Sequence, residues 1–135
     1  MKYQDAIKLL EKIKYIHARY GNALAISILG SIELAEESYS EAENCFSKCL
    51  PKYQSYHLDY IGQSQACLVY AARGLDQVSQ AQEHCYKALR IAVKNDSYLS
   101  LIHTLPGIAL LFVDQGEIER AVELYALACN YGIVA

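Results

Sequence analysis

The sequence predicts an all-α protein of about seven helices that pair antiparallel and stack into a solenoid. Two observations lead to this prediction. Apolar residues recur with the i, i+3, i+4, i+7 spacing of amphipathic helices along nearly the whole chain. A pattern of small and bulky residues also recurs at intervals of 36 to 40 residues. The chain has the length of one domain, and we interpret residues 1–135 as a single helical-repeat domain.

The repeat is anchored by small residues. Three segments share the pattern: YSEAENCFSKCL from Tyr39, VSQAQEHCYKAL from Val78 and IERAVELYALAC from Ile118. A fourth copy opens the chain, and the anchoring alanines are Ala6, Ala42, Ala81 and Ala121, which lie 36, 39 and 40 residues apart. Because small residues allow two antiparallel helices to approach closely, the following are expected to be buried: Ala42, Cys49, Ala81, Ala88, Ala121 and Ala128.

Turn and cap residues set the expected boundaries. We expect helices over residues 3–19, 23–36, 39–51, 57–73, 78–94, 97–114 and 118–131. In chain order, Gly21–Asn22 predicts the end of the first helix, Ser38-x-x-Glu41 predicts a capping box for the third, and Asp96–Ser97 offers an N-cap for the sixth. The chain therefore starts with a partial repeat, residues 1–21, followed by repeats over about 22–56, 57–96 and 97–135.

One proline falls inside an expected helix. Pro106 has no N–H to donate to the carbonyl of Ile102, and its ring crowds that carbonyl. The sequence therefore predicts either a kink near Pro106 or two shorter helices that meet near His103–Leu105.

The repeat resembles a known family. Its first copy places Ile26, Leu29, Gly30, Ala42 and Phe46 on the pattern W-x2-L-G-x2-Y followed by A-x3-F, with Glu33 departing at the tyrosine. The second copy keeps Leu68, Ala81 and Ala88, with Val69 in place of the glycine, and the third keeps Phe112, Gly116, Ala121 and Tyr125. This pattern is similar to the tetratricopeptide repeat. The resemblance implies a right-handed superhelix whose concave surface, lined by the first helix of each pair, holds a peptide or a partner helix.

The resemblance also implies which residues line that groove. Carried over position by position, they are Leu24, Ser27, Ser31 and Leu34, then Gln63, Ala66, Tyr70 and Arg73, then His103, Pro106, Leu110 and Val113. The candidate partner-binding residues among them are Gln63, Tyr70, Arg73, His103 and Leu110. The family's clamp for a terminal carboxylate is missing, because Ser27, Ser31 and Ala35 stand where its basic and amide residues begin. Such a lining suits a helix or an extended apolar peptide.

Composition excludes several classes of function. A net charge of −3 and a pI near 5.8 give no electrostatic basis for direct nucleic-acid binding. No segment has the length of apolar sequence that spans a membrane, and the N-terminus lacks the apolar core of a signal peptide. The five cysteines contain no CxxC pair, which favours a reducing cytoplasm over a secreted disulfide framework.

Neither a metal site nor an active site is expected. Cys45 and Cys49 lie four residues apart, but Cys49 occupies the small-residue slot of the repeat, and only scattered histidines, His17, His57, His84 and His103, could complete a zinc site. His84 and Cys85 are adjacent on a helix, so their side chains point about 100° apart. Phosphate-binding, dinucleotide-binding, metalloprotease and nucleophile-elbow motifs are absent from the sequence. We therefore expect no cofactor and no enzymatic activity.

A narrower resemblance concerns the last third. The segment LPGIALLFVDQGEIERAVELYALA, with its long repeat interval, is similar to helical-repeat regions of large bacterial signalling ATPases and transcriptional activators. This implies a sensor or scaffold module of a larger bacterial regulator; a stand-alone peptide-binding adaptor is the alternative. Apolar residues on the first and last helices, including Ile7, Leu10, Leu124 and Leu127, also predict a homodimer formed through a terminal helix.

Overall fold

The computed structural model describes residues 3–13, 19–53 and 57–130, and all regular structure in these ranges is helical. The α-helices are α1 (Tyr3–Ile13), α2 (Arg19–Ala35), α3 (Tyr39–Cys49), α4 (Leu58–Gly74), α5 (Val78–Lys94), α6 (Tyr98–Asp114) and α7 (Ile118–Asn130), with a short 3-10 helix η1 (Leu50–Lys52) after α3. The prediction of an all-α chain with about seven helices is confirmed.

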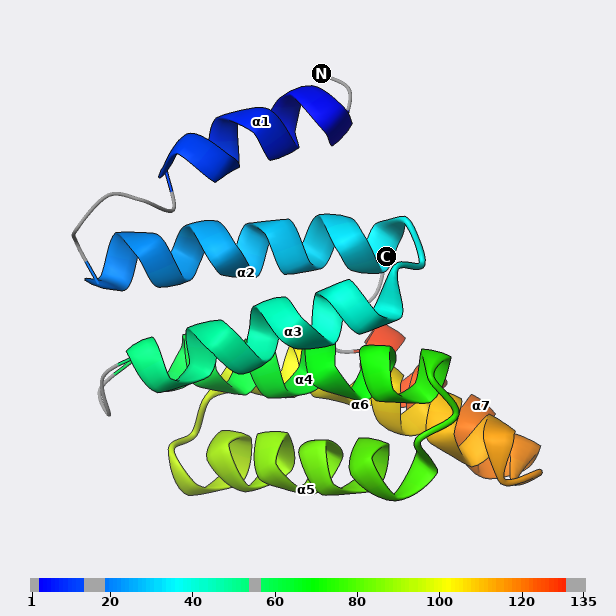
Figure 1. Cartoon of the computed structure of the whole chain (residues 1–135). Coiled ribbons are helices and arrows are strands. Elements are labelled where there is room, and N and C mark those ends of the chain that lie inside the picture. The colour runs from blue at the N-terminus through cyan, green and yellow to red at the C-terminus, as the bar shows by residue number, and fades with distance from the viewer. Residues whose placement is uncertain (1–2, 14–18, 54–56, 131–135) are drawn as a thin grey trace.

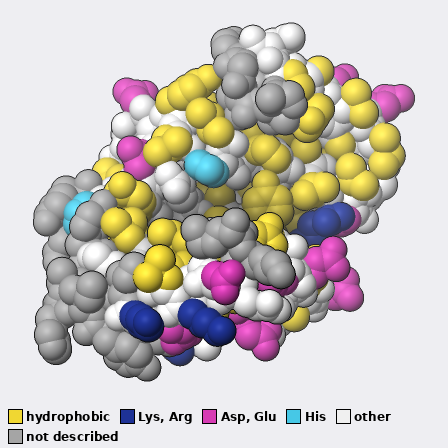
Figure 2. Space-filling model, turned by 90° about the horizontal axis from the view of Figure 1, so that it is seen from above, with side chains coloured by type: hydrophobic (Ala, Val, Ile, Leu, Met, Phe, Trp, Pro, Cys, Tyr) yellow, Lys and Arg dark blue, Asp and Glu magenta, His cyan; other side chains and the backbone are white. Residues whose placement is uncertain are grey.

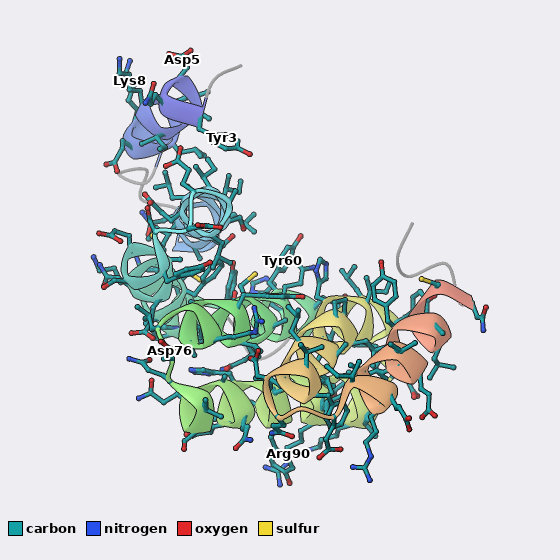
Figure 3. The ribbon with its side chains drawn as sticks, turned by 90° about the vertical axis from the view of Figure 1, so that its right-hand side faces the viewer. Tyr3, Asp5, Lys8, Tyr60, Asp76 and Arg90 are labelled. Carbon is teal, nitrogen blue, oxygen red and sulfur yellow. The ribbon has the colours of Figure 1, made fainter. Side chains whose placement is uncertain are left out.

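Consecutive helices pack against one another from α1 to α7, and α4 also packs on α6. Figure 1 shows neighbouring helices running in opposite directions, with α1 at the top, α5 at the bottom and α7 at the lower right. Seen from the side, α1, α2 and α3 form one arm and α4 to α7 form a second, so that the chain turns a corner at α4 (Figure 3). No described helix has the length and apolar character needed to cross a bilayer.

Four interhelical turns share one hydrogen-bonding scheme. The turns follow α2, α4, α5 and α6, and each is closed by a backbone N–H that donates to a carbonyl five residues earlier: Ser38 to Glu33 (2.8 Å), Gln77 to Ala72 (2.9 Å), Ser97 to Ala92 (2.9 Å) and Glu117 to Phe112 (2.9 Å). The residue before each donor has a positive φ: Glu37 (61°), Asp76 (58°), Asp96 (48°) and Gly116 (78°). Glycine adopts a positive φ most easily, yet it occupies only one of these four positions, Gly116.

Several predicted boundaries are wrong in detail. Helix α2 starts at Arg19, so Gly21 and Asn22 lie in its first turns and do not end a helix. Glycine costs a helix only about 1 kcal/mol relative to alanine, so Gly21 does not end the helix, and the Asn22 side chain accepts a hydrogen bond from Lys52 Nζ. The first helix is described only to Ile13, so the predicted remainder of that helix lies largely outside the described residues.

Of the two helix N-caps that the sequence predicts, one is wrong and the other is confirmed. Ser38 occupies the N-cap of α3, but its side chain makes no capping hydrogen bond, so the predicted capping box is wrong. Ser97 caps α6 as predicted, with Oγ accepting from the Ser100 N–H at 3.2 Å. Helix α6 continues through Pro106, which rules out two separate helices. The predicted kink at Pro106 stays a prediction.

The predicted small anchors form the helix contacts. Ala42, Cys49, Ala81 and Ala88 are completely buried and Ala121 is 4% exposed, which confirms their predicted burial, while Ala128 lies outside the described side chains. Gly30 shows how close the helices come, because a Cβ there would lie 2.9 Å from the Phe46 ring. Cores of this kind join α2, α3 and α4, and then α4, α5 and α6.

Candidate protein-interaction groove

Two of the predicted partner-binding residues, Tyr70 and Leu110, line the same groove. It has a volume of about 430 Å³ and lies between α4, α6 and α7. Its lining residues are all apolar or aromatic: Tyr70, Pro106, Ala109, Leu110, Val113, Ile118, Ala121, Val122 and Tyr125. We call this set the α4/α6/α7 groove. Figure 2 shows hydrophobic side chains gathered in a hollow on one face of the molecule.

The groove is formed by two helical stripes with identical spacing. On α6 the lining residues are Pro106, Ala109, Leu110 and Val113, and on α7 they are Ile118, Ala121, Val122 and Tyr125. Both sets follow i, i+3, i+4, i+7, which places four side chains on one face of each helix. The short turn between α6 and α7 brings the two stripes together, and Tyr70 of α4 closes one side.

Much of this apolar surface is open to solvent. The exposed fractions are 42% for Val113, 53% for Ile118, 62% for Val122 and 48% for Tyr125. Exposed apolar residues scattered singly are normal, but a contiguous set that lines a hollow is typical of a binding surface. The groove therefore has the composition of a site for an apolar partner.

Arg73 lies beside the groove and is not a free cation. Its guanidinium donates to both carboxylate oxygens of Asp114, from Nε to Oδ2 at 2.7 Å and from Nη2 to Oδ1 at 2.9 Å. This hydrogen bond is the main reason that the pKa of Arg73 is raised. The pair joins the C-terminal ends of α4 and α6 and helps to form a second, more polar pocket.

Gln63 and His103 are not among the residues that line the groove. Gln63 is half-buried on α4, and the neighbouring predicted position Ala66 is 1% exposed, so it cannot contact a partner. His103 is exposed on α6, and desolvation lowers its pKa, which favours the neutral imidazole. The structure thus brings Tyr70 and Leu110 together and leaves Gln63 and His103 outside.

Sequence reasoning missed the contribution of α7. The family's groove positions were transferred only to the first helix of each pair, so Ile118, Val122 and Tyr125 were not included. The signal was present in their i, i+4, i+7 spacing. Leu124 and Leu127, which are expected from the sequence to form a homodimer contact, do not line the groove; Leu127 is 47% exposed and Leu124 is half-buried, and the homodimer stays a prediction.

The cysteines are packed as small apolar residues, with one exception. None of the five, all of which lie in the described part of the chain, forms a disulfide, and Cys129 is the exposed one. Cys49 donates to the Phe46 carbonyl at 3.4 Å. Desolvation raises the pKa of Cys67 to about 12 and that of Cys85 to about 11, so both thiols are protonated at neutral pH. Among the described residues, no group of three or more metal-ligating side chains comes together.

His84 has a structural partner. Its Nδ1 lies 2.8 Å from Gln65 Oε1, across the α4–α5 contact. Desolvation is the largest cause of its lowered pKa, and the nearby Lys87 adds to it. The neutral imidazole is therefore favoured, and it links α5 to α4.

The chain was compared with protein-family models, with curated proteins and with solved structures. None of these comparisons gave a significant match.

Proposed function

We propose that the chain is a protein-interaction module of the cytoplasm, a sensor or scaffold element of a larger regulator, and that it binds its partner in the α4/α6/α7 groove. The observation that carries this proposal is the groove itself. It is lined only by apolar and aromatic side chains, four of which are 42–62% exposed. Burying such surface is favourable by about 25 cal/mol per Å², so a partner with a complementary apolar face would be stabilised there.

The regular packing of successive helices supports the proposal. The four interhelical turns share one hydrogen-bonding scheme, and α4 packs on both helices of the preceding pair, α2 and α3, and on α6 of the next pair. In helix-pair solenoids, partners are held on surfaces shared between repeats. A stand-alone peptide-binding adaptor would use the same groove, and the two alternatives differ in whether an ATPase or DNA-binding module accompanies this chain.

The surface does not suit a peptide recognised through its terminal carboxylate. Ser27 and Ser31 stand at positions where such a clamp would begin, and both hydroxyls donate to carbonyls of their own helix, Ser27 Oγ to Leu24 O at 2.9 Å and Ser31 Oγ to Ser27 O at 3.1 Å. Recognition is expected to depend on apolar packing, with few hydrogen bonds.

The test is selection of peptides by the groove. A phage-displayed library of random peptides is panned on the wild-type chain, and the selected peptides are measured against two double variants. Val113→Glu/Val122→Glu places charges in the groove. Val78→Glu/Val93→Glu is the matched control on α5, because its two valines are 48% and 74% exposed. Circular dichroism establishes that both variants remain folded.

Peptides are expected to bind the wild type and the α5 control and to lose binding to the groove variant. If every selected peptide binds all three proteins equally, the groove is not the interaction site and the proposal is wrong.

A further inference from the structure

The α4/α6/α7 groove on α6 and α7 is equivalent to the surface of α4 and α5, forty residues earlier, on which α6 packs. Helices α4 and α6 begin at Leu58 and Tyr98, and α5 and α7 begin at Val78 and Ile118, so both pairs are offset by 40 residues. Helix α6 packs against both α4 and α5. The surface of α6 and α7 that matches this contact is the groove.

The exposed fractions of equivalent residues show where the α6–α7 pair lacks the helix that packs on the α4–α5 pair. In the α4–α5 pair, Val69 is 1% and Cys85 is 6% exposed, and both belong to a core cluster with Leu111 of α6. The residues forty positions later are Ala109 and Tyr125. Tyr125 is 48% exposed, because no helix in the described part of the chain covers α6 and α7 as α6 covers α4 and α5.

We propose that the partner enters this groove as an amphipathic helix, packed on α6 and α7 as α6 packs on α4 and α5. This inference rests on the proposed function and specifies the partner's chemistry. The interface is a continuation of the helix packing already present in the fold, so the same ridge-and-groove geometry serves both. In a contact of this kind, the partner helix packs apolar side chains at positions i, i+3, i+4 and i+7 into the groove.

The α4/α6/α7 groove is more apolar than the equivalent surface of α4 and α5 on which α6 packs. The position of Gln82 on α5 is taken forty residues later by Val122, which lines the groove. The position of Arg73, which anchors Asp114 of α6, is taken by Val113. The partner helix therefore needs an uninterrupted apolar stripe and no acidic anchor at its end.

Charge at one end of the groove adds a second requirement. Three carboxylates, those of Asp114, Glu117 and Glu119, lie where α6 ends and α7 begins. Asp114 is paired with Arg73 and Glu117 with Arg120, whereas Glu119 has no ion pair among the described residues. A helix that runs antiparallel to α7, as α6 runs to α5, would end at these carboxylates. Lysine or arginine in its last turn is favoured by the carboxylates and by the helix dipole together.

The same charges disfavour a second copy of the chain. A two-fold axis that crossed α7 near Glu119 and Glu123 would bring these exposed carboxylates of both copies together, and like charges placed together oppose association. The partner helix is therefore expected to come from a different surface, with a basic C-terminal turn.

The probe is a peptide of residues 97–115 with Pro106→Ala and Asp114→Lys, preceded by two glutamates for solubility and capped at both ends. The peptide reproduces α6, which packs on the equivalent surface of α4 and α5, and adds a basic residue in the last turn. The control peptide carries Ala109→Pro in addition, which prevents the helix. Fluorescence anisotropy measures both peptides against the wild type, Val113→Glu/Val122→Glu and Val78→Glu/Val93→Glu.

The helical probe is expected to bind the wild type and the α5 control, and to bind the groove variant at least about tenfold more weakly. The Ala109→Pro peptide should lose a similar factor, and Glu119→Lys should weaken the probe about two- to fivefold at low salt, as expected for an exposed charge pair. Equal binding of both peptides would overturn the helical seat but leave the proposed function standing. A wild-type chain that is dimeric in light scattering, and becomes monomeric with Val113→Glu/Val122→Glu, would also overturn it, because a second copy would then occupy the groove.

Discussion

Arg73 and Asp114 hold the C-terminal ends of α4 and α6 together through two parallel hydrogen bonds of 2.7 and 2.9 Å. The residues are 41 positions apart in the chain, so the contact reports on the packing of one repeat against the next. Its two-point geometry is specific to arginine, because a lysine ammonium cannot present the same planar pair of donors.

The first prediction concerns this ion pair. Because its side chains are 37% and 33% exposed, solvent screens it, and Arg73→Lys is expected to lower the free energy of unfolding by only about 0.5–1 kcal/mol. A double-mutant cycle of Arg73→Met with Asp114→Asn, measured by urea denaturation, isolates the coupling. The exposed Lys87–Glu83 pair within α5 serves as the reference and should give a smaller value. A coupling of zero would mean that Arg73 is available to a partner, contrary to the structure.

The burial of the small residues could be predicted from the sequence because close helix contacts depend on local residue size. Ala42, Ala81 and Ala121 mark the same position in three helices, and all three are buried. Short polar turns between apolar stripes likewise fixed the number of helices. These signals lie within one helix pair and need no knowledge of distant neighbours.

The groove could be predicted only in part, because exposure depends on tertiary neighbours. Cys85 and Tyr125 occupy equivalent positions with similar surroundings in sequence, yet one is covered by α6 and the other is half-exposed. The pairing of Arg73 could not be predicted for a similar reason. Its partner Asp114 is distant in sequence, and no local pattern indicates the pairing.

The second prediction concerns the left-handed turn residues. Asp76, at the turn between α4 and α5 (Figure 3), has a φ of 58°, a conformation that costs a non-glycine residue about 1 kcal/mol. Asp76→Gly is therefore expected to raise the free energy of unfolding by up to ~1 kcal/mol, less the entropy that glycine adds to the unfolded chain. Gly116→Ala should lower it by about 1 kcal/mol. Its Cβ would meet nothing within 4 Å, so the loss is conformational alone. Equal stability of Gly116→Ala and the wild type in urea would contradict this account.

The third prediction compares two glycines at the α4–α6 contact. A Cβ on Gly62 would lie 2.2 Å from Ser100 Oγ and 2.8 Å from Ser100 Cβ, so the helices would have to separate. Gly62→Ala is expected to lower the free energy of unfolding by about 1–3 kcal/mol, as for other overpacked sites. Gly107→Ala meets Val69 at 3.3 Å, and the gain in helix propensity offsets that mild contact, so the change should be within about 1 kcal/mol of zero.

Thermal and urea unfolding of the two glycine variants give the comparison directly. Adding Ser100→Gly to Gly62→Ala removes the clashing side chain and should recover part of the loss. If Gly62→Ala and Gly107→Ala have the same effect, the close approach of α4 and α6 at Gly62 is wrong.

The fourth prediction concerns stability at alkaline pH. Desolvation raises the pKa of Cys67 to about 12 from a reference value of 9.0, so the folded chain keeps this thiol protonated after the unfolded chain has begun to lose the proton. The resulting stabilisation is fully present below pH 9 and is lost as the pH rises from about 9 towards 12. Cys67→Ala is therefore expected to unfold with a weaker pH dependence over this window than the wild type does. Cys129→Ala is the matched control, because it removes a thiol that is exposed. Urea denaturation at pH 8, 9 and 10 measures the two slopes. A Cys67→Ala slope equal to that of the wild type would show that the thiol is not desolvated in the folded chain.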